Sequence, residues 1–346
     1  TKEQLPEYFE NASVIEAHDY DNDGDLDVFI GSNSVSNNFG AIPNNYILKN
    51  NKGSFSLLKN QPFQNIGMIT DAIWEDYNSD GFTDLILVGE WMSPKFFINK
   101  EGSFKEEKII DSGLKGLWQQ ITPFDIDKDG DMDYLLGNWG KNSKFKATKK
   151  HPLRMYYSDF DGNGSTETIL CNYKNGSYYP LLGLDELASQ IVSLRKKFTT
   201  YKSMAGKSID EIFEKSILNK ATILEVQTLA SGYLKNENNR FEFVPFINEL
   251  QVSPISSFLE YDFDFDGENE ILAAGNYFGV TPFHGRFDSF PGALIIDEEQ
   301  VILGNKIGLD FSLKAVKKLD IIKVNNKPYV LATINNDWAQ VYQLIE

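Results

Sequence analysis

Apolar and acidic stretches alternate along this chain in a repeating unit. Short apolar runs typical of buried strands occupy residues 27–30, 84–88, 133–136 and 270–274. Each run follows an acidic stretch that contains a glycine, and other strand-like segments precede the acidic stretches at residues 13–17, 70–74 and 119–124. The unit therefore predicts a β-hairpin whose turn is rich in carboxylates.

The acidic turns share one nine-residue register that occurs five times, beginning at residues 19, 76, 125, 159 and 262. Position 6 is glycine in every copy, which suits a sharp turn at positive φ. Side-chain oxygens at positions 1, 3, 5 and 9 are expected to point inward, and position 7 can add its backbone carbonyl. The candidate metal ligands are Asp19, Asp21, Asp23, Asp25, Asp27, Asp76, Asn78, Asp80, Phe82, Asp84, Asp125, Asp127, Asp129, Asp131, Asp133, Asp159, Asp161, Asn163, Ser165, Glu167, Asp262, Asp264, Asp266, Glu268 and Glu270.

About six hard oxygen atoms on a flexible loop suit Ca²⁺, so five loops predict up to five calcium ions. An EF-hand begins in the same way, but it needs a bidentate Glu at position 12 and a helix on each side. Position 12 is apolar in all five copies, where Ile30, Leu87, Leu136, Leu170 and Ala273 stand. This pattern favours structural calcium in hairpin turns over calcium sensing or catalysis.

A strand-based repeat of this length is typical of β-propeller blades. The outer strands of a blade are visible after the first two loops, at residues 45–55 and 96–104. A similar pair at residues 232–243 follows the fourth loop, and we assign it to the fourth blade. A sixth blade is predicted at the end of the sequence, where Asp320 falls at position 1 of the loop register but Ile322, Val324 and Pro328, at positions 3, 5 and 9, are not metal ligands. The predicted fold is an all-β propeller with six countable blades, with seven possible.

The whole chain, residues 1–346, is predicted to form one propeller domain. The last blade is one strand short, and we expect the N-terminal segment, residues 1–12, to close it. A two-helix insertion is predicted within blade 4, at about residues 184–220. Its first helix shows apolar residues at steps of three and four, and Ser208 with Glu211 forms a capping box ahead of the second.

The formal net charge is −17, and the five loops hold 21 of the 50 acidic residues. Five divalent ions would leave a net charge of about −7, which is ordinary for a soluble domain. The acidity argues against nucleic-acid binding, which requires Lys and Arg to neutralise phosphates. No apolar run is long enough for a transmembrane helix. The chain starts at Thr1 without a visible signal peptide, so a mature form is expected, with peripheral or lipoprotein attachment possible upstream.

The pattern Asp-x-Asp-x-Asp-Gly-x-x-Asp-Leu followed by an apolar strand resembles the FG-GAP, or VCBS, repeats of integrin-α-like β-propellers. The resemblance implies calcium in hairpin loops on one face of a propeller. The helical insertion, with residues 275–280 and 285–288, is similar to VCBS-repeat surface proteins of Bacteroidetes-type bacteria, which often accompany an ASPIC/UnbV module. This resemblance implies an exported protein, at the extracellular face of the outer membrane or in the periplasm of a Gram-negative bacterium.

A second group of candidate residues, mostly aromatic, lies just after the second strand of several predicted blades. In a propeller these positions gather on the face opposite the calcium loops. Aromatic rings there can stack on sugar rings or hold a peptide, or they can pack between blades. A polar cluster in the predicted fifth blade can add to this face. The candidate ligand-binding residues are Trp91, Trp139, Tyr277, Trp338, His284 and Arg286.

Catalytic motifs are absent from the sequence, since its three histidines match no metal-ligand spacing and no nucleophile elbow or phosphate-binding loop occurs. The favoured function is a non-enzymatic, calcium-stabilised propeller that acts as a binding or assembly component at the cell surface, with a protein or glycan ligand. The alternative is a polysaccharide-degrading enzyme of the propeller lyase type. A third hypothesis is a subunit of a membrane-protein complex that makes contact through the helical insertion.

Overall fold

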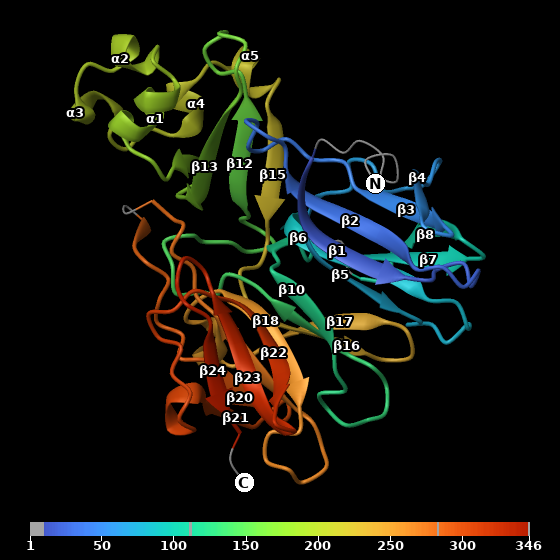
Figure 1. Ribbon diagram of the computed structural model, residues 1–346. Coiled ribbons are helices and arrows are strands. Elements are labelled where there is room, and N and C mark those ends of the chain that lie inside the picture. Colours follow the sequence, from blue (N-terminus) through green and yellow to red (C-terminus); the bar gives the residue numbers. More distant parts are fainter. Residues whose placement is uncertain (1–9, 111–112, 282–283, 345–346) are drawn as a thin grey trace.

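The structure is a computed structural model that describes residues 10–110, 113–281 and 284–344. These residues form six antiparallel sheets of three to five strands and a few short helices (Figure 1). None of the described sheets is closed into a barrel. No helix in this part of the chain is both long enough and apolar enough to cross a membrane.

The first two sheets follow the chain as simple meanders, in which each strand pairs with the next. The first contains β1 (Asn11–His18), β2 (Asp27–Ser34), β3 (Tyr46–Asn51) and β4 (Ser54–Leu57). The second contains β5 (Met68–Glu75), β6 (Asp84–Met92), β7 (Lys95–Lys100) and β8 (Ser103–Glu107), and the short β9 (Gly116–Leu117) pairs with β6.

The last two sheets are also meanders in chain order. One contains β18 (Ile255–Tyr261), β19 (Glu270–Gly275), β20 (Ala293–Ile295) and β21 (Val301–Leu303). The other contains β22 (Val316–Val324), β23 (Lys327–Ile334) and β24 (Gln340–Gln343), three strands as the sequence predicts. The predicted closure of this sheet by residues 1–12 lies largely outside the described residues; Asn11 and Ala12 belong to β1 and pair with β2.

The five acidic loops each connect two paired antiparallel strands, which confirms the predicted hairpins. Loop 1 (residues 19–27) joins β1 to β2, and loop 2 (76–84) joins β5 to β6. Loop 3 (125–133) joins β10 (Gln120–Pro123) to β11 (Tyr134–Gly137), and loop 4 (159–167) joins β12 (Leu153–Ser158) to β13 (Glu167–Lys174). Loop 5 (262–270) joins β18 to β19.

The assignment of the outer strands at residues 232–243 to the fourth blade is wrong. These strands, β16 (Gly232–Asn236) and β17 (Phe241–Pro245), extend the sheet of β10 and β11, with Leu234 opposite Tyr134. The fourth sheet has four strands without them. In it, β12 pairs with β13 on one side and with β15 (Thr222–Val226) on the other, and β14 (Ser177–Pro180) pairs with the outer edge of β13. Residues 138–231 are therefore an insertion that carries a sheet of its own, which we call the inserted sheet.

The helical part of the insertion contains five short helices rather than the two predicted. They are α1 (Leu184–Gln190), α2 (Leu194–Lys197), α3 (Tyr201–Met204), α4 (Ile209–Ile212) and α5 (Lys215–Leu218). The β-branched residues Ile191 and Val192 and then Ser193, which are poorer helix formers than Leu or Ala, follow α1 and separate it from α2. The predicted capping box of Ser208 and Glu211 is confirmed at the start of α4.

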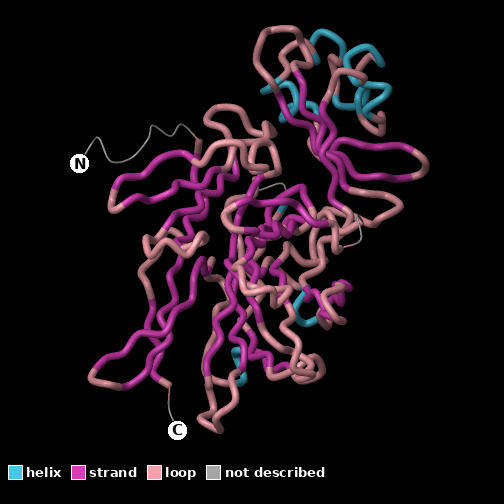
Figure 2. Tube along the Cα trace, turned by 90° about the vertical axis from the view of Figure 1, so that its right-hand side faces the viewer, coloured by secondary structure: helices cyan, strands magenta, loops and turns pink. Residues whose placement is uncertain are grey.

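The apolar residues predicted to share one helix face are buried although the helix is broken. They form one cluster with the side of the inserted sheet that carries Phe160, Ile169 and the buried free Cys171. Figure 2 shows the helices gathered at one end of the molecule, beside this sheet. The members contributed by the helical segment include Leu184, Leu187, Ile191, Leu194 and Phe198.

The remaining sheets pack face to face in chain order. Apolar clusters lie between the first and second sheets, around Phe97 and Phe104, and between the second and third, around Trp118 and Phe241. Two further clusters join the third sheet to the sheet of β18 and that sheet to the last one. We call these five sheets the serial sheets, because each one buries its face against the next.

Candidate metal sites

Position 1 of each loop organises the turn by accepting backbone hydrogen bonds. In loop 1, the Asp19 carboxylate accepts the N–H of Asp23 at 3.0 Å and the N–H of Gly24 at 2.9 Å. The same bonds recur at position 1 of loops 2, 3 and 4, and loop 5 keeps the bond to its glycine. The position-6 glycine has φ of +93° in loop 1, where a side chain would be strained.

Position 9 is buried in every loop and is fixed by another backbone N–H. In loops 1, 2 and 3 the acid accepts from an asparagine of the third strand, for example Asp27 Oδ1 from Asn50 at 2.7 Å. Asn99 and Asn236 make the equivalent bonds to Asp84 and Asp133, at 2.8 and 2.7 Å.

Loops 4 and 5 have Glu at position 9 and use a different donor. Their side chains accept from position 2, where Phe160 N–H donates to Glu167 at 3.0 Å and Phe263 N–H donates to Glu270 at 2.9 Å. Asp133 of loop 3 also accepts from its position 2, Ile126, at 3.2 Å, in addition to its bond from Asn236. A buried acid at position 9 is thus common to all five loops, while its anchor depends on the surrounding sheet.

Burial makes the position-9 carboxylates poor at carrying a negative charge. Desolvation by burial is the main cause, and the negative charges of the nearby loop acids add to it. Together they raise the pKa of Asp27 and of Asp133 to about 6 and that of Asp84 to about 7. Burial likewise raises the pKa of Glu167 and Glu270. A bound cation would remove this penalty, because an opposite charge favours the ionised carboxylate.

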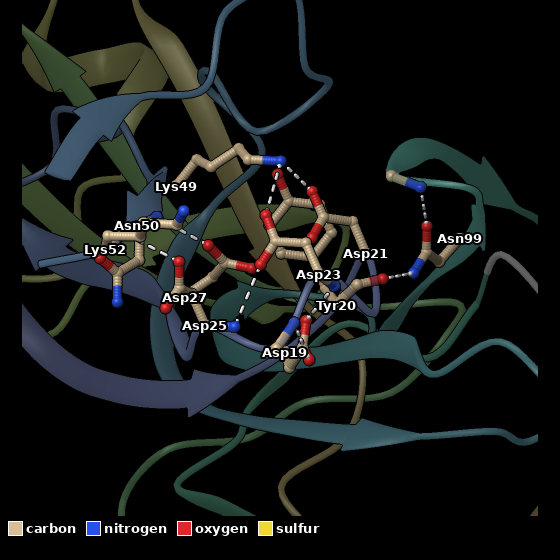
Figure 3. A network of polar contacts seen from close by, with 12 residues as sticks. Asp19, Tyr20, Asp21, Asp23, Asp25, Asp27, Lys49, Asn50, Lys52 and Asn99 are labelled. Atoms are coloured by element: carbon tan, nitrogen blue, oxygen red, sulfur yellow. Dashed lines mark hydrogen bonds and ion pairs between the residues drawn. The ribbon is translucent and has the colours of Figure 1, made fainter. Parts of the chain in front are cut away.

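The side chains of positions 1, 3 and 9 converge in four loops. In loop 1 these are Asp19, Asp21 and Asp27, and each offers an oxygen within 4.8 Å of the others. Figure 3 shows Asp21 and Asp23 directed toward the same point as the Lys49 side chain. The other three groups are Asp125, Asp127 and Asp133; Asp159, Asp161 and Glu167; and Asp262, Asp264 and Glu270.

Several of these oxygens have no hydrogen-bond partner within the described part of the chain. They are buried, and they belong to Asp21, Asp27, Asp161 and Asp262. A buried carboxylate oxygen without a donor is costly, and a hard cation is the ligand that such oxygens accept best. The residues present therefore fit a divalent cation in the loops, and loop 2 offers Asn78 in place of one acid.

Positions 5 and 7 have mainly a structural role in the described geometry. The position-5 side chain accepts the N–H of position 7 in all five loops, at 3.1 Å from Asp25 to Asp23 in the first. Asp25 itself accepts the N–H of Lys52 at 2.8 Å. The converging groups contain neither position, so a ligand role for positions 5 and 7 stays a prediction.

Two kinds of residue near the loops were missed from the sequence. The first is the third-strand asparagine described above, and the second is a lysine just before it, Lys49 or Lys235, which forms an ion pair with its loop. The signal was present, since Lys-Asn occurs at residues 49–50 and again at 235–236. Its meaning depends on strand pairing, which the motif alone does not give.

The aromatic candidates for a ligand face are placed in two different settings. Trp91, Trp139 and Tyr277 lie in one apolar cluster with Leu153 and Val226 of the inserted sheet. The Trp139 and Tyr277 rings are 5.3 Å apart. Trp338 is 88% exposed and belongs to the turn between β23 and β24.

The polar candidates lie beside this cluster. His284 is 5.2 Å from the Phe145 ring, and the exposed Arg286 lies 4.0 Å above the Phe278 ring. Arg286 also forms an ion pair with Asp288 at 3.5 Å. The structure therefore brings three aromatic candidates together under the inserted sheet and leaves Trp338 outside the group.

Comparison with known protein families supports the acidic-loop repeat over the first three loops. The family model described as FG-GAP-like repeat matches residues 19–87 and 76–136, which contain loops 1, 2 and 3. No curated protein compared with the chain matches it. Among solved structures, the biofilm matrix protein Bap1 of V. cholerae is similar, with 11% identity, a TM-score of 0.37, and coverage of 97% of this chain and 69% of that chain.

Proposed function

We propose that the hairpin loops bind up to five Ca²⁺ ions and that these ions hold the fold together. The observation that carries the proposal is the convergence of positions 1, 3 and 9 on buried oxygens, several of which have no donor in the described residues. Ca²⁺ is preferred over Mg²⁺ because a flexible loop with a backbone carbonyl suits its higher and less regular coordination. No thiol or imidazole belongs to the four groups, which disfavours zinc.

The architecture that we propose is a β-propeller of FG-GAP, or VCBS, type. The support is that the five serial sheets bury their faces against one another in chain order, as blades do. Five of the six sheets carry one acidic loop each. The loop register predicted to begin at Asp320 is wrong, because Asp320 lies within β22 opposite Leu331 and a short turn joins β22 to β23. The kinship with Bacteroidetes proteins of the ASPIC/UnbV-associated kind belongs to the same proposal.

At the cellular level, we propose a non-enzymatic, exported protein that binds a protein or a glycan at the bacterial surface. Extracellular modules of this kind bind calcium at millimolar levels, whereas cytosolic calcium would leave such loops empty. The aromatic cluster that an enzyme would use lies largely beneath the inserted sheet, which does not favour the lyase alternative. The insertion is the surface that we favour for a partner, because α1, α3 and α4 border a cavity of about 570 Å³.

The experiment that tests the proposal is thermal unfolding with and without metal. Calcium in excess of its Kd stabilises the folded state by mass action, so EDTA should lower the Tm markedly and added Ca²⁺ should restore it. Magnesium at the same concentration serves as the matched control and should restore less. An unchanged Tm in EDTA, together with no heat on titration with Ca²⁺, would exclude the proposal.

A further inference from the structure

In four of the five loops, the neighbouring strand carries a residue directly opposite the position-9 acid. The pairing of Val28 with Leu48 brings Lys49 opposite Asp27, and the pairing of Tyr134 with Leu234 brings Lys235 opposite Asp133. The same register position is Ile98 beside loop 2 and Ile296 beside loop 5. Loop 4 has no such neighbour, because β14 pairs with β13 only from Cys171 onward.

Both lysines extend into the converging acids of their own loop. The Lys49 ammonium is paired with Asp21 at position 3 and lies 3.2 Å from Asp23 (Figure 3). The Lys235 ammonium lies 2.6 Å from Asp127, also at position 3. The side chains of these two position-3 acids are only 15% and 8% exposed, so the pairs are more shielded than ordinary surface pairs.

The isoleucines at the same register position have apolar surroundings instead of contacts with the loop acids. Ile98 packs against the apolar cluster between the second and third sheets, and Ile296 borders an apolar groove next to β24. Neither side chain can offset the charge of the loop beside it. Loop 5 does meet one lysine, since Lys128 of loop 3 pairs with Glu268, but this pair is exposed and Glu268 lies outside the converging group.

We propose that Lys49 and Lys235 are tethered cations that divide the loops into two classes, an inference that rests on the proposed calcium function. In loops 1 and 3 the ammonium offsets part of the carboxylate repulsion, so the turn is held without metal and Ca²⁺ binds more weakly. Among the residues that the structure describes, loops 2, 4 and 5 meet no such cation in their converging acids, so they depend on Ca²⁺ for the same purpose. A unit charge about 5 Å from a divalent ion weakens binding by roughly tenfold even at the dielectric of bulk water, and by more at the lower dielectric of a surface site.

The test exchanges the residues of the two classes. Lys49→Ile and Lys235→Ile introduce the residue found at loops 2 and 5, and Ile98→Lys makes the reverse change. Isothermal titration of the full chain with Ca²⁺ counts the ions in a tighter and a weaker class. Each lysine removal should move one ion into the tighter class, with a gain in affinity of at least about tenfold, and should lower the Tm in EDTA. Ile98→Lys should move one ion the other way.

The matched control is Lys128→Asn, which removes the exposed ion pair with position 7 of loop 5 and should leave both classes unchanged. Asparagine is chosen because Lys128 has φ of +57°, where a β-branched residue would be strained. A variant that does not fold without metal is measured in the opposite direction, by chelator competition starting from the calcium-loaded protein. If the wild type binds no Ca²⁺, the proposed function and this inference both fail. If the wild type binds Ca²⁺ and all three exchanges leave the class counts and the Tm in EDTA unchanged, only the two-class inference is overturned.

Discussion

The serial sheets and the inserted sheet use the same acidic hairpin in different surroundings. Loop 2 lies in a sheet that buries its faces against two neighbouring sheets, and Asn99 of its third strand holds the position-9 acid. Loop 4 lies in a sheet whose face is covered by short helices, and Glu167 is held from within its own loop. The acidic loop therefore forms wherever two strands make a hairpin. The element that packs on the hairpin determines which part of the fold the loop stabilises.

The largest difference in stability between the two regions should appear when the packing of the helices on the inserted sheet is weakened. Leu187 is fully buried in the cluster between the helices and that sheet. Leu187→Ala should cost about 2–5 kcal/mol, because it removes buried methyl groups and leaves a cavity. Hydrogen exchange should show faster exchange in β12 to β15 and in α1, while β5 and β6 keep their protection.

An equal rise of exchange in β5 and β6 would show that the two regions unfold together and would remove the distinction. A matched change in the serial sheets is Leu87→Ala, at a fully buried residue between the first and second sheets. It should produce the opposite pattern, with exchange rising first in β5 and β6.

The second prediction concerns pH and applies to both regions, because position 9 is buried in both. The pKa of Asp84 is raised to about 7 by burial, with the neighbouring acids adding to the effect. A carboxyl whose folded pKa lies above its unfolded value favours folding when protonated. In EDTA, the Tm should therefore fall as the pH rises from about 5 to 8, and excess Ca²⁺ should flatten this trend.

Asp84→Asn separates this explanation from a general effect of pH. Without its carboxyl, the metal-free protein should lose part of the decline between pH 5 and 8, and the titration with Ca²⁺ should count one ion fewer. A metal-free Tm that rises with pH over this range in the wild type would contradict the assignment.

How far the sequence predicted the fold depended on how local each signal was. The hairpins were predicted correctly, because their nine-residue register is contained in each loop. The partner of β16 was predicted wrongly, because the pairing of Leu234 with Tyr134 spans the whole insertion and an apolar strand shows no preference among sheets. The prediction of two helices in the insertion was also wrong, since burial against the inserted sheet requires only that Leu187 and Leu194 face it, not that they share one continuous helix.

The acidic residues of the candidate metal sites could be predicted from the sequence, but the residues that surround them could not. Positions 1, 3 and 9 were identified from spacing, and the structure brings them together in four loops. Lys49 and Asn50 were not identified, because their role follows from the register between β2 and β3. The partial burial of Trp139 against the cluster under the inserted sheet depends on the same long-range topology.

A third prediction tests a contact between the first two serial sheets. The buried Asn99 amide donates to the backbone carbonyl of Tyr20 in loop 1 at 2.7 Å and to that of Thr83 at 3.0 Å. Asn99→Ala leaves both carbonyls without this donor and should cost about 1–3 kcal/mol in the free energy of unfolding. Urea denaturation measures the change.

The equivalent residue of the third sheet provides the comparison. Asn236 donates to the carbonyl of Met132 in its own hairpin at 3.1 Å, and the described contacts include no bond from its amide to another sheet. Asn236→Ala should therefore cost less than Asn99→Ala. Equal losses would mean that the bond to Tyr20 contributes nothing to the packing of the first sheet on the second.

The smallest effect is expected at the edge of the inserted region. The Glu211 carboxylate accepts the N–H of Ser208 at 2.8 Å and closes the capping box of α4. Glu211→Ala should cost about 0.5–1 kcal/mol, because it removes one capping bond from an exposed helix end. Glu211→Gln keeps an acceptor and should recover most of the loss in urea denaturation. Because α4 covers only the inserted sheet, the destabilisation should leave the calcium titration of the serial loops unchanged; a shift in that titration would show that the two regions are coupled.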